Sequence, residues 1–342
     1  MSRTLSRPVS GPSARSLGDS GILLAAIFAI ASSALLVRWA DAPAVALAFW
    51  RTLGGALVLG FLATVRPSAE SRPAPSVVEA AGVSPRSRLS SSRRIRLTVA
   101  GLALAVHFAT WLASLELTSV AASVTLVATA PLMIGLYFTV RGQPPTPATW
   151  VALLLALVGT AIIATGDVSG QPIVVDTVAG AEPDGGPLGL SRAIWGDILA
   201  LIGAGAMAVY LIVGAELRRV LSTTAYTWRA YGVAAAGLAV GAGVARVPIV
   251  GFDVQTWGAI VAMTAGPQLI GHTGLNHLLR RLGSLTVSLA LLTEPVAATA
   301  LVWLALGEVP PATSLLGAPL VLGAIALHLL TAGRGPNLPD SG

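Results

Sequence analysis

A single carboxylate lies in the middle of a long apolar stretch. Residues 284–307 are apolar apart from small hydroxyl side chains and Glu294, which Pro295 follows directly. At about 1.5 Å per residue the stretch is roughly 36 Å long, enough to cross a hydrocarbon core of about 30 Å. A lone acid there is costly in lipid, so we expect Glu294 to face protein or a water-filled cavity. Because burial disfavours the charged form, we also expect it to carry a proton. The alternative is a protonated structural acid that hydrogen-bonds a neighbouring helix.

Two histidines in other apolar stretches add groups that titrate near neutral pH. His107 precedes Trp111 by one helical turn and His272 precedes Asn276 by the same spacing, so each pair shares a helix face. Such histidines shuttle protons or bind anionic groups, and the alternative is an interhelical hydrogen bond. No third residue of metal-ligand type accompanies them, so we expect no metal and no cofactor.

Two arginines also lie within apolar stretches, each directly after a tryptophan. Arg51 and Arg229 are predicted either to bind a carboxylate of the substrate or to extend towards the membrane surface. Tyr210, like Trp111, is a candidate to stack on a planar substrate, although such aromatics also anchor helices at the interface. Asp19 and Asp197 begin apolar stretches, where an aspartate most simply caps a helix.

The elements that position these residues are membrane-spanning helices. Of 342 residues, 54% are hydrophobic and 11% charged, against about 25% charged in soluble domains. The composition predicts an all-α integral membrane protein, and the absence of cysteine excludes disulfides, thiolate metal sites and cysteine catalysis. Ten spans are predicted, at about 21–37, 44–65, 97–115, 118–140, 148–165, 193–213, 223–245, 254–277, 284–306 and 312–332.

The arginines predict how these spans are oriented. With the N-terminus in the cytoplasm, the inner segments hold most arginines, including seven in the Ser/Pro/Arg-rich loop 66–96, while the outer loops hold three. The positive-inside rule therefore places both termini, the tails 1–20 and 333–342, in the cytoplasm and the loop 166–191 outside. Because the arginines gather beside one membrane face, the basic charge of the chain does not indicate a nucleic-acid partner.

The two halves of the chain, 21–165 and 192–332, contain matching residues. Five spans per half is an odd number, so the halves enter the membrane from opposite sides, as in the inverted repeats of secondary transporters. The paired prolines predict helix breaks near mid-membrane, where such transporters bind their substrates. The matches are Gly18-Asp19 with Gly196-Asp197, Trp50-Arg51 with Trp228-Arg229, His107 with His272, Pro131 with Pro295, and Gly142 with Gly307.

Several of these stretches resemble one known family. HFATWLASLELTSVAASVTLVATAPL (107–132), WGDILALIGA (195–204), GHTGLNHLLRRL (271–282) and EPVAATALVWLALGEVPPATSLLGAPLVLGAIAL (294–327) are similar to the EamA family of the drug/metabolite transporter superfamily. The resemblance implies ten helices in two inverted five-helix halves. It also implies secondary transport, often export, of amino acids, nucleotide-like metabolites or drugs. Gln143 departs from the Glu that the family often has after this Gly.

We therefore expect a secondary active transporter, not an enzyme, in the plasma (inner) membrane. It would export a small metabolite or drug-like solute by alternating access, with protons as the coupling ion and the lipid bilayer as its surroundings. The alternative is an integral membrane enzyme that acts on a lipid or prenyl substrate. Such an enzyme needs clustered acids or histidines at one membrane face, and the chain has no such cluster. A passive channel does not need the mid-span acid or the paired prolines.

Overall fold

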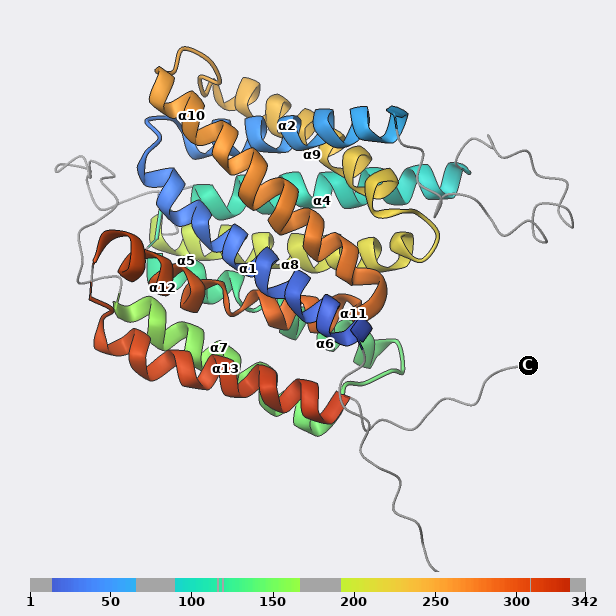
Figure 1. The fold of residues 1–342 in the computed structure, drawn as a ribbon, viewed down its shortest axis with the longest axis vertical. Coiled ribbons are helices and arrows are strands. Elements are labelled where there is room, and N and C mark those ends of the chain that lie inside the picture. Colours follow the sequence, from blue (N-terminus) through green and yellow to red (C-terminus); the bar gives the residue numbers. More distant parts are fainter. Residues whose placement is uncertain are drawn as a thin grey trace, which may run out of the picture.

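The structure is a computed structural model in which residues 14–65, 90–115, 117–118, 120–166, 192–307 and 309–332 are described. Within those ranges every regular element is a helix (Figure 1). The described residues leave out 1–13 of the predicted tail 1–20, 66–89 of the loop 66–96, 167–191 of the loop 166–191, and the tail 333–342. The helices are α1 (Ala14–Arg38), α2 (Ala44–Val65), α4 (Ser91–Leu115), α5 (Val120–Val127), α6 (Ala130–Val140), α7 (Pro147–Gly166), α8 (Arg192–Arg218), α9 (Thr223–Ala245), α10 (Val254–Met263), a π-helical segment (Thr264–His272), α11 (Thr273–Leu291), α12 (Glu294–Leu306) and α13 (Ala312–Ala332).

Seven of these helical segments are long and apolar enough to cross a membrane. The count rises to eight if residues 254–291 and 294–305, which are bent by 56° at their break, form one further span. The fold is therefore that of a multi-span membrane protein, with its apolar runs folded into helices because a helix satisfies its own backbone hydrogen bonds in lipid.

Some predicted helix ends are wrong. The helix α4 begins at Ser91, so the last six residues of the predicted loop 66–96 are helical. The Arg-rich first residues of α4 are exposed and extend the helix before the start of the apolar run. Asp19 and Asp197 do not cap helices, because α1 begins at Ala14 and α8 at Arg192.

Ordinary end signals set several other boundaries. Ser222 and Asp253 cap α9 and α10, since their side chains accept hydrogen bonds from the backbone N–H of Ala225 (3.1 Å) and Thr256 (2.8 Å). Gly307 ends α12 in the left-handed region (φ 71°), where glycine lacks the steric penalty of a Cβ atom.

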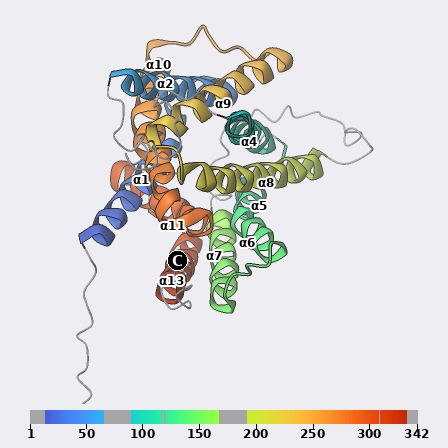
Figure 2. The ribbon, with the colours of Figure 1, turned by 90° about the vertical axis from the view of Figure 1, so that its right-hand side faces the viewer.

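Helices from the two halves of the chain pack in pairs. The helices α7 and α13 run beside each other along the lower edge of the view in Figure 1, and α4 lies against α8. In Figure 2, α2 and α9 are neighbours at one end of the molecule. The largest hydrophobic cluster contains buried side chains of α2, α4, α8, α9 and α11. The core therefore lies at the interface between the two halves, where the candidate residues also lie.

Candidate functional site

Arg51 of α2 is the charged centre of the buried interface. Its side chain is only 8% exposed, and its Nη2 lies 3.1 Å from Nε2 of His272. Its guanidinium carbon lies 4.5 Å from the centre of the Phe108 ring, close enough for a cation–π contact. Because a guanidinium can only donate, Nε2 of His272 is the acceptor in this hydrogen bond. The residue thus joins α2, α4 and the π-helical segment, and its Nε atom has no partner among the described residues.

His107 holds α4 against α8. Its Nδ1 lies 2.9 Å from the backbone oxygen of Gly203, and since a carbonyl only accepts, Nδ1 carries the hydrogen. The imidazole is stacked on Trp111, with ring centres 5.9 Å apart and planes 13° apart. The Nε1 atom of Trp111 is buried and has no partner in the described part of the chain. Phe108 is in ring contact with both histidines, His107 and His272, so all of these side chains form one cluster around Arg51.

The π-helical segment contains a site residue that the sequence did not reveal. Gln268 is fully buried, and neither atom of its side-chain amide has a partner among the described residues. It lies one turn before His272 and against Gly55 of α2, where a Cβ atom would come within 2.8 Å of its Cγ. π-Helical turns are rare and often occur at functional sites. The available signal was Pro267, which removes a backbone donor inside a predicted span.

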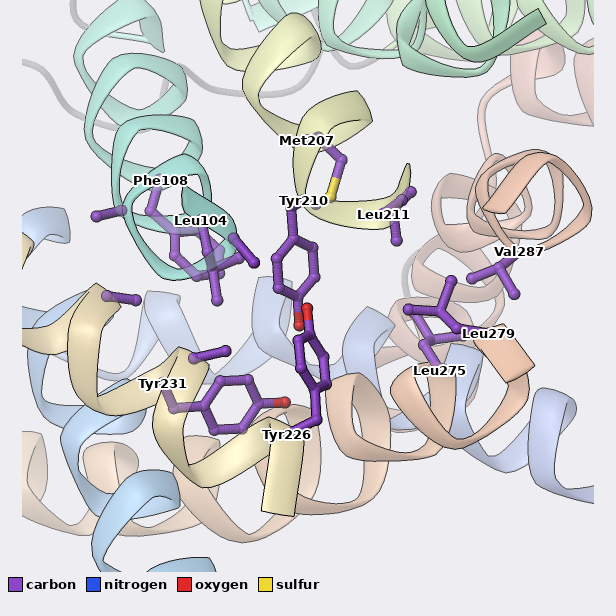
Figure 3. Close-up of a cluster of buried hydrophobic side chains, with 14 of the residues drawn as sticks. Leu104, Phe108, Met207, Tyr210, Leu211, Tyr226, Tyr231, Leu275, Leu279 and Val287 are labelled. Atoms are coloured by element: carbon purple, nitrogen blue, oxygen red, sulfur yellow. The ribbon is translucent and has the colours of Figure 1, made fainter. Parts of the chain in front are cut away.

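A second polar group lies between α8, α9 and α11, centred on Asn276. The hydroxyl of Tyr210 donates to its Oδ1 (2.8 Å), and its Nδ2 donates to the hydroxyl of Tyr231 (3.3 Å). Nε of Arg218 donates to its backbone oxygen (2.9 Å). Figure 3 shows Tyr210 and Tyr231 with Tyr226 beside them, surrounded by leucine side chains. The sequence predicted Tyr210 and Asn276 separately, whereas Tyr231 and Arg218 gave no signal because helix rotation decides what faces inward.

Glu294 begins the half-helix α12, directly after the break between α11 and α12. The carboxylate is half-buried, and its charge and that of Arg51 act on each other. These two described side chains do not form an ion pair within 4.0 Å. The helix N-terminus and the nearby cation favour the carboxylate, while the low dielectric favours the neutral acid.

The two prolines follow matching breaks. Pro131 lies in the first turn of α6 and Pro295 in the first turn of α12. The residues at the breaks have nearly the same backbone angles, φ −76° and ψ −9° for Thr129 and φ −78° and ψ −9° for Thr293. Each threonine hydroxyl donates a hydrogen bond of 2.6 Å to the carbonyl oxygen three residues earlier. The position of Glu294 is occupied by Ala130 in the first half, so only one break carries a charge.

Arg229 does not join the cluster around Arg51. Its Nη1 donates to the backbone oxygen of Ala225 (2.6 Å), and its guanidinium lies 4.4 Å from the ring centre of Trp228. The side chain is half-buried, as expected for an arginine that extends along its own helix. Of the predicted site residues, the structure thus groups Arg51, His272, His107 and Trp111, pairs Tyr210 with Asn276, and leaves Arg229 apart. In the described ranges no three acidic or histidine side chains are close enough to hold a metal ion.

Comparison with known families assigns the chain. The model of the EamA-like transporter family matches residues 16–165 and, a second time, residues 194–330. The chain belongs to the EamA-like transporter family. It is therefore a multi-span membrane transporter of the drug/metabolite transporter superfamily, and the alternative of a lipid-modifying enzyme is not favoured.

A similar fold is also found among solved structures. One of them, titled "Crystal structure of protein", is 20% identical to this chain and superposes with a TM-score of 0.69. The match covers 94% of this chain and 99% of the other, so the similarity extends over the whole fold. No curated protein matches the chain.

Proposed function

We propose that this protein is a secondary active transporter that exports a small metabolite or drug-like solute in exchange for protons. The observations that carry the proposal are the buried cluster of Arg51, His272 and Phe108, and Glu294 at the break that begins α12. A buried cation with an unused N–H group suits an anionic group of the solute. A carboxylate whose charge is coupled to that cation suits the proton. Binding of one then changes the affinity for the other.

We propose further that the chain has ten spans. Gly283, with φ 76° and ψ 169°, is not helical and divides α11 into two helices. Residues 254–282 and 284–306 are then separate spans, and α9, with 23 residues, is long enough to be another. Together with the seven long apolar segments, these make ten, five in 21–165 and five in 192–332.

The packing of the helices supports an inverted relation between the halves. If a two-fold axis relates the two halves, a contact between one span of the first half and a different span of the second half must occur twice. The second contact joins the equivalents of those two spans, each in the other half. The pairs α2 with α9 and α7 with α13 match themselves under such an exchange. The contact of α4 with α8 is matched by the contact of α1 with the π-helical segment and α11. Five spans per half then require an axis in the membrane plane.

The orientation and location follow from the arginines. We place both termini and the loop 66–96 in the cytoplasm and the loop 166–191 outside, in the cell (inner or plasma) membrane. The cluster around Arg51 then lies between the two faces, and alternating access exposes it to each face in turn. Glu294 would load a proton on the outer, more acidic side and release it inside, which drives the solute outward.

The test begins with finding the solute, by profiling metabolites inside and outside cells with and without the gene. Purified protein in proteoliposomes then carries the solute against its gradient when a pH gradient is imposed. Glu294→Gln keeps the size and hydrogen-bonding capacity of the side chain but cannot ionise. We expect this variant to fold and to bind the solute, yet not to move it uphill on the pH gradient.

A surface acid provides the matched control. Glu216 is exposed and paired with Arg96 at 3.2 Å, so Glu216→Gln should leave proton-driven transport unchanged. Uphill transport by Glu294→Gln at the wild-type rate would contradict proton coupling through Glu294.

A further inference from the structure

Two equivalent aspartates connect helices at opposite ends of the molecule. Asp19 in α1 and Asp197 in α8 each follow a glycine at matching positions of the two halves. Oδ1 of Asp19 accepts a hydrogen bond from Nη1 of Arg281 at 2.5 Å. Oδ1 of Asp197 accepts one from the hydroxyl of Thr118 at 2.8 Å. Neither aspartate caps a helix, so both contacts are tertiary.

The partners of the two aspartates lie at corresponding connections. Arg281 precedes Gly283, where the chain turns between residues 254–282 and 284–306. Thr118 lies between α4 and α5, at the corresponding connection of the first half. The first turns of α1 and α8 point to opposite ends of the helix bundle (Figure 1). One contact therefore closes the cytoplasmic end and the other the external end, in the orientation proposed above.

We propose that these contacts are two latches, an inner latch (Asp19 with Arg281) and an outer latch (Asp197 with Thr118), which release in turn during transport. The inference rests on the proposed alternating access of two inverted halves. Each latch ties the first helix of one half to the connection that precedes a broken span, Val120–Val140 or Ser284–Leu306. Release of a latch frees that span to move away from α1 or α8 at one face only.

The two latches are not equally tight. A Cβ atom on Gly196 would lie 2.7 Å from the backbone N of Thr118, so the backbones of these two residues are in close contact at the outer latch. A Cβ atom on Gly18 would meet nothing within 4 Å. The inner latch is an ion pair in which the Arg281 side chain is 46% exposed, and solvent and salt weaken such pairs. The inner latch therefore opens more easily, which favours loading of solute from the cytoplasm and agrees with export.

The chain offers a matched pair of reporters for this mechanism. Ala26 and Ala204 lie two turns beyond Asp19 and Asp197 on the same helices, and both are 0% exposed. The sequence has no cysteine, so Ala26→Cys or Ala204→Cys places a single thiol behind each latch. The rate at which a water-soluble maleimide labels that thiol in the full-length purified protein reports the opening of that end.

The latch variants should act on one reporter each. Asp19→Asn should raise the labelling rate of Ala26→Cys by about threefold to fivefold, the scale of a weak ion pair, and leave Ala204→Cys unchanged. Asp197→Ala should have the opposite pattern. High salt should act like Asp19→Asn on the inner reporter and leave the outer one unchanged.

Two further variants separate a latch from general loosening. Arg281→Gln should raise labelling at the inner reporter, whereas Arg280→Gln, at its exposed neighbour, should not. The charge exchange of Asp19→Arg with Arg281→Asp should restore protection of the inner reporter. Equal increases at both reporters, no increase at either, or no restoration by the exchange would overturn the proposal. Labelling needs neither solute nor a pH gradient. The latch proposal can therefore be tested even if the proposed proton coupling fails.

Discussion

Arg51 and Arg229 allow the importance of the buried cluster to be measured with a built-in control. Both arginines follow a tryptophan at the same position of their half, and Gln can replace either without a large loss of volume. Arg51 contacts His272 and Phe108 in the interior, while Arg229 bonds only its own helix and lies over Trp228. We predict that Arg51→Gln impairs transport and that Arg229→Gln does not.

The contacts of Arg51 set the size of the expected effect. A hydrogen bond that involves a charged group contributes about 1.5–3 kcal/mol, which corresponds to roughly tenfold to hundredfold in rate. Arg51→Gln should therefore lower the initial rate of solute uptake into proteoliposomes by about that factor. Arg229→Gln should change the rate by less than about twofold, because exposed or self-bonded charges contribute little. Arg51→Lys keeps the charge but loses the planar donor set, so its uptake rate should lie between those of Arg51→Gln and Arg229→Gln.

Stability must be measured alongside transport to give the comparison meaning. Thermal unfolding of both variants in detergent shows how much of any loss comes from misfolding rather than from the site. Equal losses of transport in Arg51→Gln and Arg229→Gln would refute the assignment of Arg51 to the site. A wild-type uptake rate in Arg51→Gln would refute it as well.

Two further predictions concern packing and the polar group at Asn276. Gly159→Ala should lower the free energy of unfolding by about 1–3 kcal/mol, because its Cβ would lie 2.8 Å from the backbone oxygen of Gly317. Gly323→Ala, where the Cβ meets nothing within 4 Å, should instead be neutral or raise it by up to about 1 kcal/mol. Asn276→Leu should lower it by about 1–3 kcal/mol, because the Tyr210 hydroxyl loses its acceptor while the Tyr231 hydroxyl stays 3.4 Å from that of Thr273, and Tyr210→Phe should lower it by less. Thermal unfolding in detergent checks all four, and equal stability of the two glycine variants would contradict the packing argument.

Helix positions were predictable from the sequence because two simple quantities set them. The length of an apolar run decides whether a helix can cross the membrane, and a proline or glycine marks where it breaks. The breaks before Pro131 and Pro295 follow directly from this chemistry. The start of α4 was misplaced because a helix can extend into water beyond its apolar run.

Side-chain partners were much harder to predict, because they depend on how each helix is rotated. Arg51 and Arg229 both follow a tryptophan in the sequence, yet only Arg51 faces the interior cluster. Gln268 lies in a π-helical segment, which shifts the side chains that follow relative to an α-helix. Tyr231 was missed because the rotation of α9 decides that it faces Asn276, and nothing in its local sequence shows this.

The difference between the two helix breaks bears on the stoichiometry of the proposed exchange. Thr129 and Thr293 have the same backbone conformation and the same hydroxyl contacts, so the break itself belongs to the repeat. The carboxylate belongs to one copy only, because the first half has Ala130 where the second has Glu294. If both breaks serve the motion of their halves, the coupling of protons to transport in our proposal depends on Glu294, which only the second break has. Nδ1 of His107 already bonds the backbone oxygen of Gly203, so under the proposed exchange the single carboxylate at the breaks would carry one proton in each cycle.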